Sequence, residues 1–406
     1  MNNRLFLTVI LSTVILSLSF AQGSRYSGPY VSSTPISWNG VKNQTISGLE
    51  IENPNGHCIE LINCSNITIE NCKLGPSLNE GVNLYKCTNI VVTNCTMDNN
   101  DTGVYAGACS GINVMFNDVI NVQGPLPRGQ MVQFAEVTGG GNSVSYNVVE
   151  NILGESHPED AISLFKSNGI AGSPIRIVGN WIRGGGPSDS GGGIMTGDMG
   201  GSYILVEDNV LVNPGQYGIT IASGTNIAIK NNKIYGKRQE FSNIGLSAYK
   251  QYQIDTHSDT IMQNQVNFRY MDGQLNNLLN DGKCGTIYGW ETNAYNPILN
   301  ENILPAKIIG RATIQGVATE TVPLPAVKEI KIYPNPASDH LTIESSAELN
   351  HGFITIYNIS GQKMIDEALN VSSTEINTTN LAVGVYLVKV MDNNELIEQK
   401  KIMIRK

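Results

Sequence analysis

The chain has 406 residues with 26 Lys+Arg and 35 Asp+Glu, a formal net charge of -9, which argues against electrostatic attraction of the whole chain to nucleic acid. Only 15% of its residues are charged and 42 are glycine, a composition that excludes a helix bundle, while 41% hydrophobic residues exclude a disordered chain. The composition predicts an all-β protein with many turns, long enough for two or three domains.

The N-terminus has the pattern of a secretory signal. Arg4 precedes an apolar run from Leu5 to Phe20, and small residues at Ser19 and Ala21 predict cleavage after Ala21. The alternative is an uncleaved anchor, but the run is short for a span, which needs about 20 apolar residues. No later run is long enough, so we expect a signal peptide at 1–21 and no transmembrane segment in the mature protein.

The middle of the chain repeats. The sequence ITIENC at 67–72 recurs as IVVTNC at 90–95, a shift of 23 residues, and 59–64 recurs at 82–87 with the same shift. An asparagine returns after later short alternating strands, at Asn117, Asn147, Asn180, Asn209 and Asn232. Stacked turns that share one core are typical of a solenoid, and stacked Asn residues can hydrogen-bond along its axis. No LxxLxLxxN consensus supports a leucine-rich repeat.

These repeats predict a parallel β-helix. The pattern resembles the right-handed β-helix of pectate-lyase-like proteins over about residues 35–315, and we expect that domain to span 22–316.

The cysteines follow the repeats. Cys64, Cys87 and Cys109 share one register, and Cys72 and Cys95 share another. Seven cysteines, with Cys58 and Cys284 included, leave at least one thiol unpaired in a monomer. We expect buried apolar ladders. Disulfides between turns, which export would permit, are the alternative.

Several turns contain insertions, most of them just before the first strand of the turn. They lie at Val122–Arg128, Gly154–Glu159, Ile170–Pro174, Gly184–Gly192 and Gly236–Glu240. Insertions on one edge of a solenoid often frame a binding face. They predict a groove over the strands Met131–Glu136, Ala161–Lys166, Gly193–Asp198, Gly218–Ala222 and Ile244–Tyr249. Neutral variation in loop length is the alternative.

The segments 159–168, 180–193 and 213–218 resemble bacterial β-helix polysaccharide lyases, in particular alginate-lyase-like members, within about residues 128–252. The resemblance implies a secreted lyase that cleaves an acidic, uronate-containing polysaccharide, with alginate as the expected substrate, by β-elimination.

Such an elimination needs a base, an acid and a group that neutralises the uronate carboxylate. We assign Lys166 as the base, Tyr217 as the acid and Arg183 as the carboxylate-binding group, with His157 as an alternative base. The alternative is that Lys166 has no catalytic role and is a solvated bend residue like Lys86. The expected substrate-binding residues are Gln133, Asp160, Ser163, Asp198, Gln216 and Lys250.

A competing set consists of acids. These are Glu155, Glu159, Asp160, Asp189 and Asp198. Two of them could serve as the acid and base of a glycoside hydrolase. Alternatively, several could bind calcium, so we assign no cofactor but keep a calcium ion as an alternative. A third possibility is a non-catalytic glycan-binding surface protein. Basic residues in later turns could attract an acidic glycan; they are Lys230, Lys233, Lys237, Arg238 and Lys250.

The last eighty residues differ from the repeats. A linker at 317–327, with Pro323 and Pro325, precedes short strand-like runs of a small antiparallel sandwich. The motifs IYPNP at 332–336, YNISG at 357–361 and LAVGVYL at 381–387 resemble the type IX secretion C-terminal sorting domain over 328–406. The resemblance implies type IX secretion machinery as a partner and export through the periplasm and outer membrane, to the medium or the cell surface. A carbohydrate-binding sandwich is the alternative.

Overall fold

The computed structural model describes residues 25–311, 330–345, 352–358, 362–369, 373–392 and 395–406, together with the short paired strands β1 (Gln22–Gly23) and β33 (Thr313–Ile314). The predicted signal peptide at 1–21 and the predicted linker at 317–327 lie outside these residues. Within the described part of the chain, no helix is long and apolar enough to cross a membrane.

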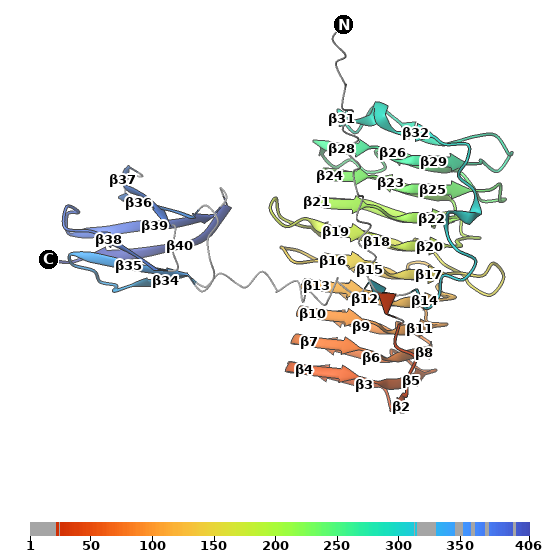
Figure 1. The fold of residues 1–406 in the computed structure, drawn as a ribbon, viewed down its shortest axis with the longest axis horizontal. Helices are drawn as coiled ribbons and strands as arrows, with labels where there is room; N and C mark the ends of the chain where they lie inside the picture. Colours follow the sequence, from red (N-terminus) through yellow and green to blue (C-terminus); the bar gives the residue numbers. More distant parts are fainter. Residues whose placement is uncertain are drawn as a thin grey trace, which may run out of the picture.

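Residues 31–295 wind into a parallel β-helix, as the repeats predicted (Figure 1). Each turn contributes up to three short strands, and each strand pairs in parallel with its counterparts in the turns before and after. The strands therefore form three stacks, which we call the first, second and third stack in chain order. The long strand β21 (Ile194–Glu207) belongs to both the first and the second stack, so that these two form one 20-stranded sheet.

The first stack contains, besides β21, the strands β3 (Ile36–Asn39), β6 (Ile59–Ile62), β9 (Val82–Tyr85), β12 (Val104–Gly107), β15 (Val132–Ala135), β18 (Ile162–Asn168), β23 (Tyr217–Ile221), β26 (Ile244–Ala248) and β30 (Leu278–Asn280). The second contains β4 (Lys42–Ser47), β7 (Ser65–Glu70), β10 (Thr88–Thr93), β13 (Ser110–Met115), β16 (Ser143–Ser145), β19 (Ile175–Val178), β24 (Gly224–Lys230), β27 (Thr256–His257), β28 (Asp259–Met262) and β31 (Ile287–Tyr288). The third contains β2 (Val31–Ser32), β5 (Leu49–Asn53), β8 (Lys73–Ser77), β11 (Thr96–Asp98), β14 (Asp118–Ile120), β17 (Val148–Glu150), β20 (Trp181–Arg183), β22 (Val210–Val212), β25 (Lys233–Gly236), β29 (Gln265–Phe268) and β32 (Ala294–Tyr295).

The core runs along the axis of the solenoid. In the second stack Ile67, Ile90 and Ile112 lie in register on successive turns and are fully buried. Alternation along each strand sends every second side chain inward, so identical positions on successive turns pack on one another. A turn cannot bury its own apolar face, and this stacking supplies the missing contacts.

A column of buried asparagines ties the turns together at the bend between the second and third stacks. Asn180 is fully buried, and its Oδ1 accepts from the backbone N–H of Asn147 at 3.0 Å and from Asn147 Nδ2 at 3.1 Å. Asn180 Nδ2 donates in turn to Asn209 Oδ1 at 2.9 Å. The same pattern links the members of the column, which are Asn117, Asn147, Asn180, Asn209, Asn232, Asn264 and Asn293.

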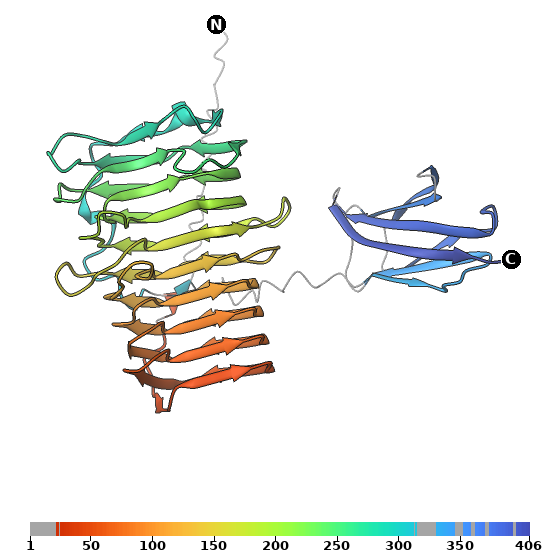
Figure 2. The ribbon, with the colours of Figure 1, turned by 180° about the vertical axis from the view of Figure 1, so that it is seen from behind.

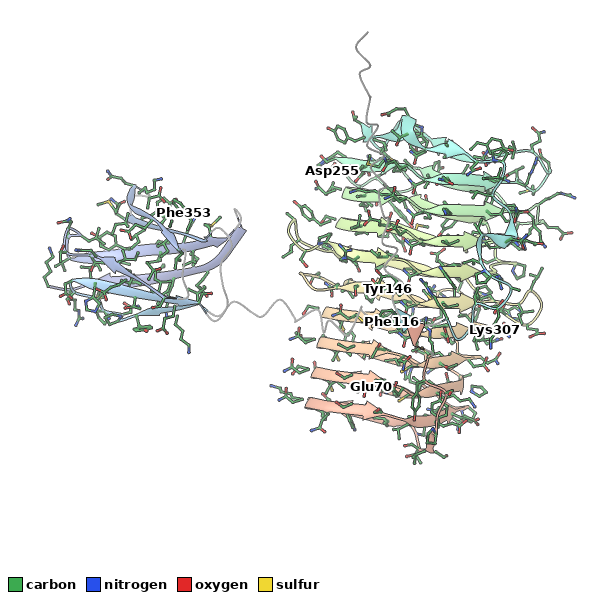
Figure 3. All side chains as sticks on the ribbon, viewed as in Figure 1. Glu70, Phe116, Tyr146, Asp255, Lys307 and Phe353 are labelled. Carbon is green, nitrogen blue, oxygen red and sulfur yellow. The ribbon has the colours of Figure 1, made fainter. Side chains whose placement is uncertain are left out.

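The structure corrects the start of this column. Sequence spacing placed Asn71 and Asn94 in it, but they lie one residue earlier, at a bend whose residues have positive φ angles. That outer position is next occupied by Phe116 and Tyr146, at φ 57 for both, whose rings stack at 5.3 Å (Figure 3). Asparagine tolerates left-handed backbone well, which explains why it marks this bend in the early turns. The buried position there is Cys72 and then Cys95.

All seven cysteines are buried and unpaired, so the apolar-ladder interpretation is the one the structure has. Cys95 Sγ accepts the backbone N–H of Cys72 at 3.5 Å, and the N–H of Cys95 is bound by Asn117 Oδ1 at 3.0 Å. In the other register, Cys109 Sγ accepts the N–H of Cys87 at 3.2 Å. Cysteine thus occupies the ladder position in the first turns, and asparagine takes over later.

The outer face of the third stack is covered by the end of the solenoid domain. After the short helices η1 (Trp290–Thr292) and η2 (Glu301–Ile303), the chain packs Leu304 and Ile308 against Val148 and Val212. Figure 2 shows the solenoid from behind, with this segment crossing several turns. This covering leaves the outer face of the first stack available for a groove.

The C-terminal domain is a separate antiparallel unit. One sheet has the order β34 (Ile330–Tyr333), β35 (His340–Ser345), β38 (Ser373–Asn377), and the other has the order β37 (Lys363–Leu369), β36 (Gly352–Asn358), β39 (Gly384–Asp392), β40 (Glu395–Ile404). Leu341 and Ile343 pack with Ile354, Ile356 and Val388 in a core of its own. This arrangement confirms the predicted all-β class with a small antiparallel second domain.

We expect Asn180→Ala to lower the free energy of unfolding by about 2–4 kcal/mol, because two buried donors of Asn147 lose their acceptor. Urea denaturation followed by circular dichroism measures this loss. Arg176→Ala, an exposed change in the same turn, is the control and should leave stability within about 0.5 kcal/mol. Equal stability of the two variants would contradict a structural role for the column.

Candidate functional site

A groove with a volume of about 520 Å³ lies on the outer face of the first stack. Its floor comes from β9, β12, β15, β18 and β21, and one wall comes from the insertions, which contribute Arg128, Glu159 and Ser190. The structure thus places a groove over the first three of the five strands predicted for it. It differs in extending toward the N-terminus, and the strands β23 and β26 do not line it.

Two rows of outward side chains run along the groove floor. In the first row Tyr105, Gln133, Ser163 and Met195 lie in register on successive strands. The second row contains Tyr85, Gly107, Ala135, Phe165 and Asp198. Because parallel strands keep this register, each row repeats at the strand spacing of about 4.8 Å.

A β-bulge in β21 turns Asp198 into the second row. Ser163 pairs with Met195 but Phe165 pairs with Asp198, so β21 has one extra residue between these positions. Gly197 has φ +68, and a Cβ there would lie 1.7 Å from the carbonyl oxygen of Ser223. Only glycine fits this position, and bulges are known to re-aim side chains near functional sites.

Asp160 lies immediately before β18, where the wall meets the floor. Its Oδ1 accepts the backbone N–H of Gly192 at 3.0 Å and the hydroxyl of Tyr217, which is itself 5% exposed. Burial raises the pKa of Asp160 to about 7, helped by the charges of Asp198 and Glu159 and opposed by the two hydrogen bonds. Oδ2 accepts no hydrogen bond from the described residues, so it is the oxygen available to the groove.

Two further carboxyls lie beside Asp160. Asp198 Oδ1 accepts the hydroxyl of Tyr252 at 2.7 Å, and burial raises the pKa of Asp198 although this hydrogen bond opposes the shift. Glu159 Oε2 accepts the hydroxyls of Ser188 at 2.7 Å and Ser190 at 2.8 Å, which fixes it to the insertion 184–192. The groove therefore holds three oriented acids at one end.

The other end of the groove is built around Arg128. Its Nε donates to Glu80 Oε1 at 2.7 Å, its Nη1 donates to Gln133 Oε1 at 3.2 Å, and its guanidinium lies 4.1 Å from the centre of the Tyr105 ring. Glu80 is buried and also pairs with His57 Nδ1 at 2.7 Å. The charge of Arg128 is thus already compensated by a buried carboxylate.

The structure does not bring Lys166, Arg183 and Tyr217 together. Lys166 is an exposed bend residue with φ 49, and its Nζ lies 4.9 Å from the centre of the Phe165 ring, outside the lining of the groove. Lys86 has the same bend position three turns earlier, with φ 53 and its Nζ 5.1 Å from the centre of the Tyr85 ring. The bend interpretation of Lys166 therefore describes its position.

Arg183 lies in the third stack, away from the groove. Its Nη1 pairs with Glu150 at 2.9 Å and donates to the carbonyl of Ala306 at 2.9 Å, and its Nη2 donates to the carbonyl of Pro305. Sequence position alone suggested proximity because Arg183 ends a strand one bend before the groove wall.

Of the remaining predicted residues, some line the groove and others do not. Tyr217 is buried and does not line the groove, but its hydroxyl donates a hydrogen bond to Asp160, which does. Five predicted residues line the groove: Gln133, Glu159, Asp160, Ser163 and Asp198. Several others do not line it: His157, Gln216, Lys250, Glu155, Asp189, Lys230, Lys233, Lys237 and Arg238. His157 is exposed in its insertion.

Sequence analysis missed the residues at the Arg128 end and Tyr252. Tyr85 and Tyr105 lie at outward-facing positions of two successive first-stack strands, β9 and β12. The alternation of inward and outward residues in the repeats could have indicated both positions. Tyr252 reaches Asp198 from a loop 54 positions away, and no pattern indicates that contact. Among the described residues, no group of three or more His, Cys, Asp or Glu is arranged to hold a metal ion.

Comparisons with known proteins agree with both parts of the fold. Residues 34–199 match the family model described as "Right handed beta helix region", and residues 331–405 match the model "Secretion system C-terminal sorting domain". The sorting domain directs the protein through the outer membrane, by type IX secretion, to the cell surface or the extracellular space.

A curated relative shares a short segment. Over 93 residues the chain is 30% identical to "Funoran endo-beta-hydrolase" of Wenyingzhuangia aestuarii, a match that covers 23% of this chain and 13% of the relative. The chain therefore spans only a small part of the relative's length.

Several solved structures match the chain at low similarity. A mutant DFA-IIIase from Arthrobacter chlorophenolicus A6 has 11% identity and a TM-score of 0.38, over 63% of this chain and 61% of that one. The catalytic domain of a GH87 alpha-1,3-glucanase in complex with nigerose has 14% identity and a TM-score of 0.35, over 64% and 49%. Likenesses at this level carry no argument about function.

The positions of Lys166 and Arg183 yield a prediction. Lys166→Met should keep kcat within about threefold, since its ammonium group lies outside the groove. Arg183→Ala should lower the melting temperature rather than kcat, because it removes an ion pair and two bonds to the covering segment. Steady-state kinetics and thermal melts measure both; a more than tenfold loss of kcat in folded Lys166→Met would restore its predicted role as the base.

Proposed function

We propose that the protein is a secreted glycoside hydrolase, with Asp160 as the general acid and Asp198 as the second carboxylate. The observation that carries the proposal is that two carboxyls in one groove are held in different environments. Asp160 has a pKa of about 7 and one oxygen available, whereas Asp198 is bound by Tyr252 and is less perturbed. Carboxyl pairs whose pKa values are separated by their surroundings are the usual machinery of glycoside hydrolysis.

In this mechanism Asp160 protonates the glycosidic oxygen from Oδ2 as the bond to the anomeric carbon breaks. Oδ1 stays bound to Gly192 N–H and to the Tyr217 hydroxyl, which orient the carboxyl and stabilise the anion left after proton transfer. Asp198 supplies the negative charge that the anomeric carbon requires, either through an activated water or by direct attack. Glu159, fixed by two serine hydroxyls, adds a third acid beside the pair.

The name of the curated relative supports hydrolysis as a reaction class, and its short coverage leaves the substrate open. A β-elimination on alginate, which the sequence resemblance implied, has less support. Its expected base lies outside the groove lining, and its expected carboxylate-binding arginine lies in another stack. Among the described residues, Arg128 is the one arginine that lines the groove, and it is already paired with Glu80.

The reaction is tested on a panel of neutral and acidic polysaccharides. We expect new reducing ends without the ultraviolet absorbance of unsaturated uronates. Asp160→Asn and Asp198→Asn should each lower kcat by roughly 10²–10⁴-fold, the usual contribution of general acid–base catalysis.

Asp189→Asn, an exposed carboxylate in the adjacent insertion, is the matched control and should retain activity. Products that absorb in the ultraviolet and form at wild-type rate in Asp160→Asn would rule out the hydrolase.

The pH profile should report the acid. Because Asp160 must be protonated and its pKa is about 7, kcat/KM should fall as the pH rises above about 7. Tyr217→Phe removes a donor that stabilises the carboxylate, so the pKa of Asp160 rises and the alkaline limb moves to higher pH. Tyr252→Phe removes the donor to Asp198 and should instead move the acid limb to higher pH. Unmoved limbs in both variants would contradict these assignments.

A further inference from the structure

We propose that the groove binds an uncharged glycan, and that its main binding element is a trough between Tyr85 and Phe165, on the N-terminal side of the acids. The inference concerns what is bound. It rests on the proposed function only for the identity of the cleaving residues.

The trough follows from the second row of groove residues. Tyr85 and Phe165 are three turns apart in this row, a distance of about 14 Å at 4.8 Å per turn. The two positions between them are Gly107 and Ala135, which contribute no large side chain of their own, and the Tyr105 ring of the first row lies over Gly107. Asp198 follows one turn after Phe165, which places the trough directly beside the acids.

Gly107 makes room for the two tyrosine rings beside it. A Cβ at Gly107 would lie 3.0 Å from Tyr105 Cε1, 3.1 Å from the Tyr105 hydroxyl and 3.3 Å from Tyr85 Cδ2, so the two rings lie over this position. The backbone of Gly107 does not have a positive φ, so the absence of a side chain serves space rather than conformation. Tyr85 is 42% exposed although it is a large aromatic residue. Exposed aromatic rings around a shallow hollow offer flat apolar surface to the ring faces of a ligand.

Polar groups beside the trough suit hydroxyls. Ser163 Oγ has no hydrogen-bond partner among the described residues, and Gln133 uses only its Oε1, for Arg128. Both residues line the groove in the first row. A few oriented neutral donors and acceptors above an aromatic floor are typical of a site for a polyhydroxylated, uncharged ligand.

The charges of the groove disfavour an anionic glycan. The charged residues of its lining are four carboxyls and one guanidinium: Glu136, Glu159, Asp160, Asp198 and Arg128. Arg128 is compensated by Glu80, and with Asp160 protonated as the proposed acid, the three carboxylates of Glu136, Glu159 and Asp198 still outnumber Lys86 and Lys166 at the neighbouring bends. Each carboxylate or sulfate of a polyanion would meet like charges, which penalises binding. The groove is therefore a poor match for the acidic polysaccharide that the sequence resemblance implied.

The test measures binding in the full chain carrying Asp198→Asn, so that cleavage does not interfere. The probes are neutral gluco-, xylo- and agaro-oligosaccharides on one side, and alginate, pectate and carrageenan oligosaccharides on the other, titrated by calorimetry at low and high NaCl. We expect at least one neutral probe to bind. Its Kd should change less than about twofold between roughly 20 and 300 mM NaCl, because salt screens interactions between charges and an uncharged ligand has none.

Three variants locate the site. Tyr85→Ala and Gly107→Leu should weaken neutral binding about tenfold or more. Ile62→Ala, at the same row position one turn outside the groove, should bind like the parent. Thermal melts identify any variant that fails to fold, and Tyr85→Ala, which truncates an exposed ring, keeps the test decisive if Gly107→Leu does not fold.

The proposal is overturned if anionic probes bind more tightly than neutral ones and gain affinity at low salt, if no neutral probe binds, or if Tyr85→Ala binds as the parent does. A wild-type protein that binds a neutral glycan in the trough but cleaves none would refute the hydrolase and leave this inference standing. Hydrolysis at the wild-type rate in Tyr85→Ala and Gly107→Leu would support the hydrolase and refute the trough as the main binding element.

Discussion

The hydrogen bond between a buried asparagine amide and the preceding turn sets the geometry on which the rest of the solenoid depends. Each Oδ1 binds both the backbone N–H and the Nδ2 of the asparagine one turn before, as between Asn209 and Asn180 at 2.9 Å each. A slip of one residue would leave these buried donors without acceptors, at a cost of about 1–3 kcal/mol for each. The column therefore fixes the register of the turns from Asn117 onward, and with it most positions in the rows of outward side chains that form the groove.

The column and the groove occupy different edges of the molecule. The asparagines lie at the bend from the second to the third stack, whereas the insertions that bear Arg128 and Glu159 lie at the bend from the third to the first. Loops can therefore lengthen at the groove without disturbing the hydrogen bonds that hold the turns. The same separation lets the groove keep a buried, perturbed carboxyl such as Asp160, an arrangement that does not favour stability by itself.

The spacing of the repeats was sufficient to predict the fold, but it did not predict the direction in which individual side chains point. The 23-residue shift predicted the turns, the first-stack strands and the edge where the insertions gather, because these depend only on spacing. Lys166 was assigned to the groove from its place at a strand end, yet a left-handed backbone at that bend sets its ammonium outside the groove lining. Asp198 faces the groove because of a bulge at Gly197, and a glycine inside a strand is the only trace of it in the sequence.

The residue type at the ladder position changes along the solenoid. In the first turns, which are 23 residues long, the ladder position is cysteine, whose sulfur accepts the N–H of Cys72 at 3.5 Å, a weak bond. From Asn117 to Asn209 the spacing grows to 30, 33 and 29 residues, and there each junction has two amide hydrogen bonds of 2.9–3.1 Å. Doubling a loop costs about 0.6 kcal/mol in closure entropy, whereas one buried hydrogen bond contributes about 1 kcal/mol. The same two bonds, at 2.9 Å each, also join Asn209 to Asn232 at a spacing of 23 residues, so the amide ladder is not confined to the long turns. In the long turns its bonds contribute more than the extra closure cost of the loops that form the groove wall.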